Sequence, residues 1–225
     1  MLVSTVATLQ DNSTHGEDTF LVRDLGNQAF LDAVLDGVTG HAGQEASKSA
    51  AEALNTVAAT SADAVAQVLT EMNDEFFQVG GGRMLLTTAS VALFLDGQLH
   101  VITAGDSPVY LVRGGSIQQL SGRKGGFLPV GAARAVGSHQ KLELTRTSIL
   151  VEPGDRLVLT TDGVSDNLLP DELAGTVQAA ASPQDAAAQV ERLIGERLEG
   201  GNRPALLGPR FRHDDRTAIF RFFQA

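Results

Sequence analysis

The sequence predicts an α+β fold in which pairs of helices cover antiparallel sheets. Helical patterns occur as two adjacent pairs, within residues 44–77 and 171–198, and not singly between strands. The remaining segments are short apolar runs joined by tight turns such as Asp96-Gly97, which is typical of antiparallel strands. Long antiparallel runs combined with paired helices place the helices outside the sheets.

The N-terminal part of the chain predicts strands. Apolar residues alternate with polar ones, or run together, in residues 1–9, 19–22 and 30–35. The pair Gly26-Asn27 separates the last two segments, so we expect them to form a β-hairpin. The third segment stops at Asp36-Gly37, and this turn pair holds a carboxylate at the end of a buried strand.

Two helices are expected next. Residues 44–59 and 61–77 carry apolar side chains at helical spacing. Ser61 is a suitable N-cap for the second helix, and Gly80-Gly81-Gly82 ends the region. Two adjacent amphipathic helices can cover one face of a sheet.

The pattern then changes back to strands. We expect short strands at residues 86–95, 98–104, 108–112, 116–120, 142–151 and 156–161. Residues 121–139 contain five glycines and no clear period, which predicts a long loop of the kind that often has a functional role. Two further helices, at residues 171–180 and 183–198, precede a last strand at residues 218–223.

Composition narrows the classes of function. A net charge of −10 argues against general binding to nucleic acids or anionic membranes. The chain has no cysteine, which excludes disulfides, thiolate metal sites and a cysteine nucleophile. No apolar run approaches the roughly 18 residues of a membrane span, so a cytoplasmic protein is expected. With 225 residues, the chain is expected to form one domain over residues 1–225.

Acidic residues recur beside turns at the ends of the expected strands. They are Glu17-Asp18, Asp36-Gly37, Asp106, Asp162-Gly163, Asp166 and Asp214-Asp215. Several like charges together are unfavourable unless cations neutralise them. Oxygen ligands without cysteine favour Mg²⁺ or Mn²⁺ over zinc. Two such ions can activate a water and hold a phosphate oxygen, which phosphoester hydrolysis requires.

A single Asp-Gly pair is more often a plain turn, and Asp96-Gly97 is an example. Six groups in order carry more weight: Glu17-Asp18; Asp36-Gly37-Val38-Thr39-Gly40-His41 with Glu45-Ala46-Ser47; Thr87-Thr88-Ala89; Gly105-Asp106-Ser107; Thr161-Asp162-Gly163-Val164-Ser165-Asp166; and Asp214-Asp215-Arg216-Thr217. In this order and spacing the chain resembles the metal-dependent protein serine/threonine phosphatases of the protein phosphatase 2C (PPM) type. The resemblance covers almost the whole chain, whose length suits a stand-alone bacterial catalytic domain.

The resemblance implies a four-layer αββα sandwich, with two antiparallel β-sheets flanked by pairs of helices. It also implies Mn²⁺ or Mg²⁺ as cofactor, with two ions and a third site. The implied metal-binding residues are Glu17, Asp36, Gly37, Asp106, Asp162, Asp166 and Asp214. In this scheme residues 121–139 correspond to a flap beside the active site.

The resemblance assigns different roles to these residues. Asp36 would bridge two ions, with the Gly37 carbonyl on the first ion and Glu17 acting near it through water. Asp162 and Asp214 would hold the second ion. The third site would take Asp106, Asp162 and Asp166.

Two positions depart from the family's pattern. Many members carry a phosphate-binding arginine about four residues before the Glu-Asp pair, where this chain has Ser13, so a bidentate guanidinium contact is missing. Some relatives have a histidine after the first Asp-Gly as general acid, where this chain has Val38. Candidates to replace the arginine are His15, Arg83 and Arg123, and candidate proton donors are His15 and His41.

The implied function is hydrolysis of phosphoserine and phosphothreonine on proteins by metal-activated water, without a phosphoenzyme. The expected partner is a phosphorylated signalling protein, the product of a Ser/Thr kinase. The catalytic candidates are Asp36, Asp162, Asp214, His15 and His41. Two alternatives stay open: a metal-binding pseudophosphatase that recognises a phosphorylated partner, favoured by the lost arginine, and a phosphatase for a small phosphoester.

Overall fold

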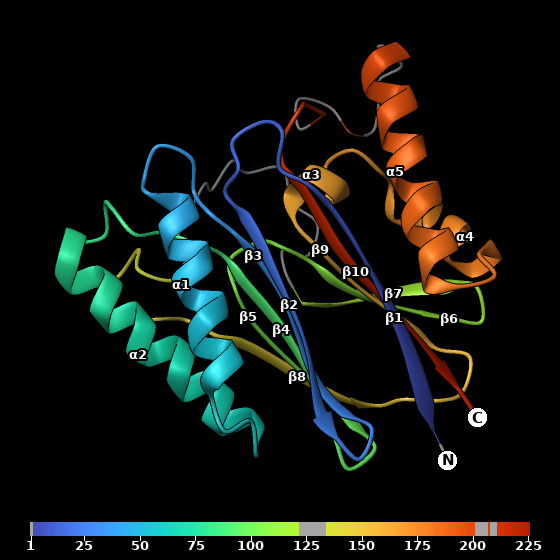
Figure 1. The fold of residues 1–225 in the computed structure, drawn as a ribbon, viewed down its shortest axis with the longest axis horizontal. Helices are drawn as coiled ribbons and strands as arrows, with labels where there is room; N and C mark the ends of the chain where they lie inside the picture. The colour runs from blue at the N-terminus through green and yellow to red at the C-terminus, as the bar shows by residue number, and fades with distance from the viewer. Residues whose placement is uncertain (1, 122–133, 201–206, 208–210) are drawn as a thin grey trace.

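The computed structural model describes residues 2–121, 134–200, 207 and 211–225. These residues form ten β-strands and five α-helices. Two five-stranded antiparallel sheets pack face to face, and a pair of helices covers the outer face of each sheet (Figure 1). The predicted α+β sandwich of four layers is confirmed.

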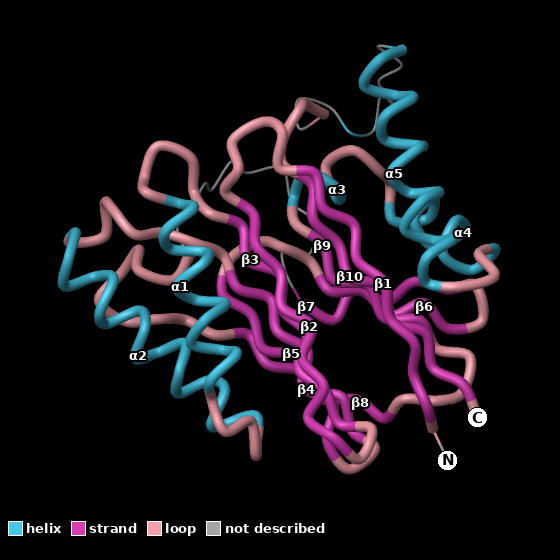
Figure 2. Tube along the Cα trace, in the orientation of Figure 1, coloured by secondary structure: helices cyan, strands magenta, loops and turns pink. Residues whose placement is uncertain are grey.

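The first sheet joins the two ends of the described chain. Its order is β1 (Val3–Asp11), β10 (Arg216–Gln224), β9 (Arg156–Thr160), β6 (Val109–Arg113) and β7 (Ser116–Ser121). Helices α4 (Pro170–Ala179) and α5 (Pro183–Gly200) cover its outer face. Figure 2 shows β1 and β10 running side by side next to these helices.

The second sheet carries the predicted hairpins. Its order is β2 (Asp18–Gly26), β3 (Ala29–Asp36), β4 (Ala89–Leu95), β5 (Gln98–Ala104) and β8 (Thr145–Leu150). Helices α1 (Gly43–Thr56) and α2 (Ala62–Gly80) cover it, and the hydroxyl of Ser61 caps α2 by accepting from the Ala64 amide at 3.1 Å. At the β4–β5 turn Asp96 and Gly97 both have positive φ, as a tight hairpin turn requires.

Strand β3 shows how the two sides of a sheet divide the core. Leu31, Ala33 and Leu35 pack against α1 and α2. Phe30 and Val34 face the other sheet, where they meet residues of β6, β9 and β10. Because side chains alternate along a strand, Asp36 lies on this inner face at the strand's end. The fold therefore brings its carboxylate to one end of the space between the sheets.

A buried ion pair links the two sheets. Asp32 of β3 is fully buried, and its carboxylate accepts from Nε and Nη2 of Arg221 on β10 at 2.7 and 2.8 Å. The guanidinium also donates to the Ser4 hydroxyl at 2.9 Å and lies 3.8 Å from the centre of the Phe30 ring. The pair ties the strand that ends at Asp36 to the strand that follows Asp214 and Asp215.

The structure corrects several sequence predictions. Asp162 and Gly163 form the start of a short helix, α3 (Asp162–Ser165), where a turn was expected. Strand β4 begins at Ala89 and not at Leu86, because Thr87 and Thr88 bond to the main chain of Asp36. Most of the expected loop, residues 122–133, lies outside the described residues. Its last part packs back on the fold, where Val136 and Thr87 form an isolated β-bridge.

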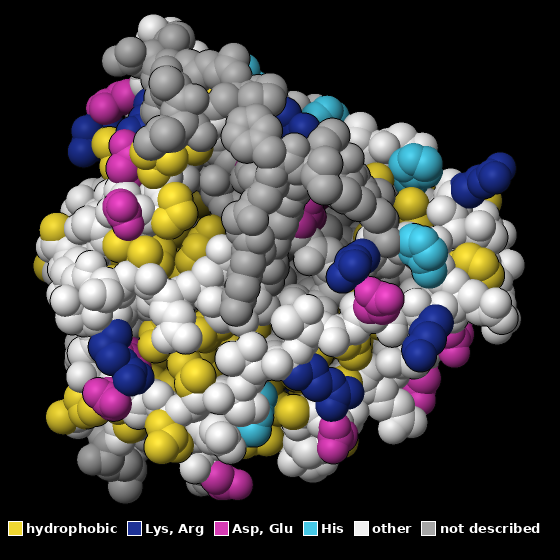
Figure 3. All heavy atoms as spheres, turned by 180° about the vertical axis from the view of Figure 1, so that it is seen from behind, with side chains coloured by type: hydrophobic (Ala, Val, Ile, Leu, Met, Phe, Trp, Pro, Cys, Tyr) yellow, Lys and Arg dark blue, Asp and Glu magenta, His cyan; other side chains and the backbone are white. Residues whose placement is uncertain are grey.

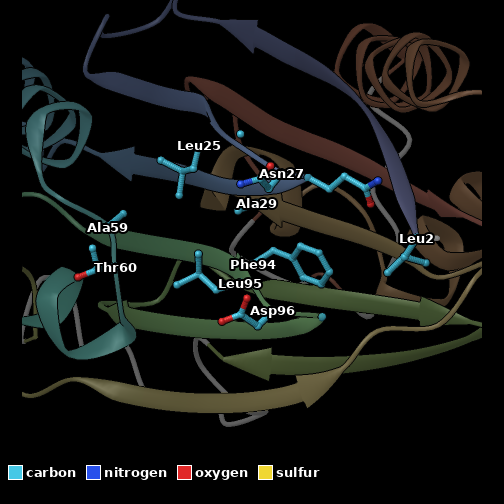
Figure 4. Close-up of a pocket in the computed structure, with 12 residues that line it drawn as sticks. Leu2, Leu25, Asn27, Ala29, Ala59, Thr60, Phe94, Leu95 and Asp96 are labelled. Carbon is cyan, nitrogen blue, oxygen red and sulfur yellow. The ribbon is translucent and has the colours of Figure 1, made fainter.

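The surface and a cavity at the end of the sandwich away from Asp36 complete the description of the fold. From behind, basic and acidic side chains are interspersed over the described part of the surface (Figure 3). A cavity of about 560 Å³ lies at the opposite end of β3 from Asp36, between the β2–β3 and β4–β5 turns (Figure 4). Asp96 is the acidic residue that lines it. No helix among the described residues is long and apolar enough to cross a membrane.

Candidate active site

Two carboxylates meet where β2 begins and β3 ends. Asp18 and Asp36 are direct partners in the antiparallel ladder, and the Gly37 amide donates to the Glu17 carbonyl at 3.2 Å. The Thr39 hydroxyl donates to the Glu17 carboxylate at 2.6 Å. The hairpin therefore holds three acidic residues at one end of the sandwich.

The main chain around Asp36 is held on both sides. Its amide donates to the Thr88 hydroxyl at 3.1 Å, and its carbonyl accepts from the Thr88 amide at 2.8 Å. On the other side Gly37 packs against Gly43 so closely that a Cβ on Gly37 would lie 2.4 Å from the Gly43 carbonyl carbon. The glycines let the start of α1 press on the end of β3, which fixes the position of the Asp36 backbone.

The second group of carboxylates comes from the end of β9 and the start of β10. Asp162 follows Thr161, whose hydroxyl donates to the Asp18 carboxylate at 2.7 Å. A Cβ on Gly163 would lie 1.8 Å from the Asp215 carbonyl oxygen. Glycine is thus required for α3 to pack against the Asp214-Asp215 segment. This contact brings Asp162 and Asp214 together.

Asp215 organises the loop before β2. Its carboxylate accepts from the amides of Thr14, His15 and Glu17 at 3.1, 2.9 and 2.8 Å. The side chain is only 4% exposed, so these hydrogen bonds replace its hydration. They hold the loop that contains Ser13 beside Asp214.

The charges of these residues act on one another. Burial, followed by the charges of Asp162, Asp18, Asp106 and Asp214, raises the pKa of Asp36 well above its usual value. Burial and the charge of Asp214 raise the pKa of Asp162 to about 7; the charge of Arg212 opposes this rise, and the charges of Asp166 and Asp106 add smaller contributions to it. Burial likewise raises the pKa of Asp18 to about 7. We call this set the carboxylate cluster: Asp18, Asp36, Asp106, Asp162, Asp166 and Asp214.

One cation already lies in the carboxylate cluster. Nε of Arg212 donates to Oδ2 of Asp214 at 2.7 Å, and Nη2 donates to Oδ2 of Asp162 at 3.0 Å. Among the residues that the structure describes, no three acidic or histidine side chains converge as a ready metal-ligand set. The guanidinium instead supplies a positive charge between two of the carboxylates.

The two candidate histidines have different surroundings. Nδ1 of His15 lies 3.2 Å from Oδ1 of Asp214, so this ring borders the carboxylate cluster. Nδ1 of His41 donates to the main-chain carbonyl of Arg83 at 2.9 Å. His41 is therefore held by the loop after α2, whereas His15 is held by the cluster itself.

The structure brings most of the acidic residues named from the sequence to one end of the sandwich. Asp36, Asp106, Asp162, Asp166 and Asp214 lie in one electrostatic group, with Glu17 and Gly37 next to Asp36. Asp18 and Asp215 were named from the sequence without a ligand role, and Arg212 was given no role. The acidic pairs Glu17-Asp18 and Asp214-Asp215 contain the first two, whereas Arg212 belongs to an arginine-rich C-terminal segment for which a solvated face was favoured over a binding rim. Arg123, a candidate phosphate ligand, lies outside the described residues.

Comparisons with known proteins identify the family of the chain. A family model described as stage II sporulation protein E (SpoIIE) matches residues 29–220. The chain belongs to the SpoIIE/PP2C-type phosphatase family. Over 121 residues it is 32% identical to the Arabidopsis thaliana protein named probable protein phosphatase 2C 80. That match covers 49% of this chain but only 28% of the plant protein, so the chain spans a small part of that relative.

Solved structures of bacterial family members share the fold. PppA, described as a key regulatory component of T6SS in Pseudomonas aeruginosa, is 25% identical, with a TM-score of 0.79 over 98% of each chain. The catalytic domain of the serine/threonine protein phosphatase PstP, solved with two manganese ions, is 23% identical, with a TM-score of 0.74 over 100% of each chain. Stp1 from Staphylococcus aureus is 17% identical, with a TM-score of 0.79 over 98% of this chain and 95% of Stp1. The last two likenesses show a common fold.

Proposed function

We propose that this chain is a metal-dependent protein serine/threonine phosphatase and that residues 1–225 act as one catalytic domain. One observation carries the proposal: Asp36, Asp162 and Asp214 are brought together from distant parts of the chain, and their charges oppose one another's ionisation. Such an arrangement is costly for stability alone, and it is typical of sites that bind cations. Family membership supports the phosphatase assignment.

The donor set fits Mn²⁺ or Mg²⁺. All the donors are oxygens, and the position of the Arg212 guanidinium between Asp162 and Asp214 supports a cation site there. Asp36, Asp162 and Asp214 would hold the ions, with Gly37, Glu17, Asp106 and Asp166 as additional ligands. Bound ions supply charge neutralisation and water activation at neutral pH. The manganese ions of the PstP catalytic domain support two as the expected number.

The chain's own residues prepare the site. Thr88 and Gly37 fix the backbone of Asp36, and Asp215 holds the loop that carries His15. His15 is the better placed of the two candidate proton donors. Asp214 orients its ring through Nδ1, which leaves Nε2 to exchange a proton with a substrate oxygen. His41 keeps its Nδ1 proton on the Arg83 carbonyl.

We propose a phosphorylated protein, modified on serine or threonine by a kinase, as the substrate. The names of PstP and Stp1 as serine/threonine phosphatases support this choice. The exposed mouth of the site also suits a side chain presented on a protein surface: Arg212 is 56% exposed and His15 is 37% exposed.

The test is hydrolysis of p-nitrophenyl phosphate and a phosphothreonine peptide by the purified chain. We expect turnover with Mn²⁺ and none after chelation with EDTA. Asp36→Asn and Asp162→Asn should each lower turnover by roughly a hundredfold or more, because loss of a residue that only hydrogen-bonds to a metal ligand already lowers activity by up to about a hundredfold. Asp96→Asn is the matched control, because it removes a carboxylate at the opposite end of the sandwich. If neither substrate is hydrolysed in the presence of Mn²⁺, the proposal is rejected.

A binding function is the second candidate. Two observations favour it: Ser13 stands where many family members have a phosphate-binding arginine, and Arg212 already neutralises two of the carboxylates. A pseudophosphatase would retain a phosphothreonine peptide without releasing phosphate in the same assay. A phosphatase for small phosphoesters would instead release phosphate from p-nitrophenyl phosphate and leave the peptide intact.

A further inference from the structure

Arg212 lies in an unusual place for a surface arginine. Its side chain is 56% exposed, yet its guanidinium bonds to two carboxylates that are 26% and 15% exposed, those of Asp162 and Asp214. Burial alone would lower the pKa of Arg212, but the charges of Asp162, Asp214 and Asp166 raise it above its ordinary value. The arginine is therefore held at the edge of the carboxylate cluster by charge and by hydrogen bonds.

The guanidinium occupies carboxylate oxygens that a divalent cation would need as ligands. It takes Oδ2 of Asp162 and Oδ2 of Asp214, one from each of the two chain segments that form this side of the cluster. Oδ1 of Asp214 is shared by the Asp215 amide at 3.0 Å and His15 Nδ1 at 3.2 Å. A cation that binds Oδ2 of Asp162 and Oδ2 of Asp214 therefore competes with Arg212 for both atoms.

The backbone of Arg212 is anchored independently of its side chain. Its carbonyl accepts from Nδ2 of Asn167 at 3.0 Å, and the same Nδ2 donates to the Gly163 carbonyl at 2.7 Å. Asn167 is fully buried beside α3. When the guanidinium leaves the carboxylates, residue 212 therefore stays next to the site, and only the long side chain has to move toward solvent.

We propose that Arg212 is an internal counter-cation that competes with the divalent metal for Asp162 and Asp214 and thereby sets the metal affinity of this chain. We call this the arginine latch. It rests on the proposed function, because it needs a metal at the same carboxylates. In the metal-free chain the latch relieves the repulsion between Asp162 and Asp214; in the metal-bound chain it is open.

The test measures Mn²⁺ binding without any substrate. Titration calorimetry, or electron paramagnetic resonance of free Mn²⁺, gives the dissociation constant for the wild type, Arg212→Ala, Arg212→Lys and a control, Arg192→Ala. Arg192 pairs with Glu196 on the exposed face of α5, so the control removes one arginine charge away from the site. We expect Arg212→Ala to bind Mn²⁺ about fivefold more tightly, which corresponds to about 1 kcal/mol, the upper end of what an ion pair with an exposed partner contributes. The control should match the wild type.

Arg212→Lys separates the latch from a general charge effect. Lysine keeps the charge but cannot bridge two carboxylates with a rigid fork. The Mn²⁺ affinity of Arg212→Lys should therefore lie between those of the wild type and Arg212→Ala. Thermal unfolding adds a second readout. Without metal, Arg212→Ala should unfold at a lower temperature than the wild type. Saturating Mn²⁺ should raise the unfolding temperature of Arg212→Ala by more than it raises that of the wild type.

The outcomes that overturn the latch differ from those that overturn the function. If the wild type binds Mn²⁺ and Arg212→Ala binds it equally or more weakly, the latch is wrong and the proposed function stands. If Arg212→Lys binds as the wild type does, charge alone acts and the bridging role is wrong. If no variant binds Mn²⁺, the metal-dependent function fails, and the latch with it.

Discussion

The ion pair between the sheets allows a sharp prediction about stability. Asp32 is fully buried and Arg221 is 6% exposed, and two hydrogen bonds of 2.7 and 2.8 Å join them. Asp32→Ala leaves the guanidinium buried, where it keeps its hydrogen bond to the Ser4 hydroxyl and its contact with the face of Phe30. Leaving one charge of a buried pair without its partner costs about 3–5 kcal/mol. For a domain of this size the unfolding temperature should fall by roughly 10 °C.

Replacing both partners should have a much smaller effect. Burial raises the pKa of Asp32 even though the hydrogen bonds and charge of Arg221 oppose this, so the pair does not fully offset its own desolvation. Asp32→Leu combined with Arg221→Met removes both charges and keeps apolar volume. We expect this double variant to lie within about 1 kcal/mol of the wild type or above it.

Urea unfolding followed by circular dichroism measures both effects. Asp63→Ala is the matched control, because it breaks an ion pair with Arg146 in which the side chains are 88% and 48% exposed, and exposed pairs contribute at most about 1 kcal/mol. The reasoning is refuted if Asp32→Ala is no more destabilising than this control. It is equally refuted if the double variant loses as much stability as Asp32→Ala.

Three further predictions concern the backbone, a helix cap and pH. Gly163→Ala should destabilise the protein by more than about 2 kcal/mol, because the new Cβ would overlap the Asp215 carbonyl. Gly195→Ala is the control: this glycine has open space around it in α5, so the substitution should be neutral or stabilising. Equal urea midpoints for the two variants would contradict the prediction. Ser61→Ala removes the N-cap of α2 and should cost about 1 kcal/mol by the same assay, and no change would show that the cap is dispensable. In the metal-free protein the pKa values of Asp18 and Asp162 are raised from 3.8 to about 7, so the folded state holds more protons than the unfolded state in this range. Stability after chelation should therefore fall as the pH rises from about 5 to 7.5, and a rise in the urea midpoint over this range would count against the carboxylate cluster.

Much of the fold could be predicted from local patterns. The alternation in β3, the turn at Asp96-Gly97 and the cap at Ser61 are properties of short segments, and each was found where it was expected. Asp32 and Arg221 could not be predicted as a buried pair, because each resembles an exposed residue until the two sheets are packed together. The helix α3 was missed for a similar reason: Asp162-Gly163 has the same residues as the Asp96-Gly97 turn, and only the contact with Asp215 distinguishes them.

The candidate site, like the fold, could be predicted from the sequence only in part. The acidic residues could be expected near one another because each stands beside an apolar run, and strand ends meet at the end of a sandwich. Arg212 could not be assigned from the sequence, since an arginine-rich segment near the C-terminus is more often a solvated face than a binding rim. Its role depends on a contact across 50 residues of chain, between Arg212 and Asp162.

The most direct test of the metal site is a crystal structure of the chain soaked with Mn²⁺ and measured near the manganese absorption edge. We predict anomalous density beside Asp36, Asp162 and Asp214, with the guanidinium of Arg212 turned away from both of its carboxylate partners. Absence of anomalous density at this position in a fully soaked crystal, with Arg212 still bridging Asp162 and Asp214, would contradict the proposal that these residues form a catalytic metal site.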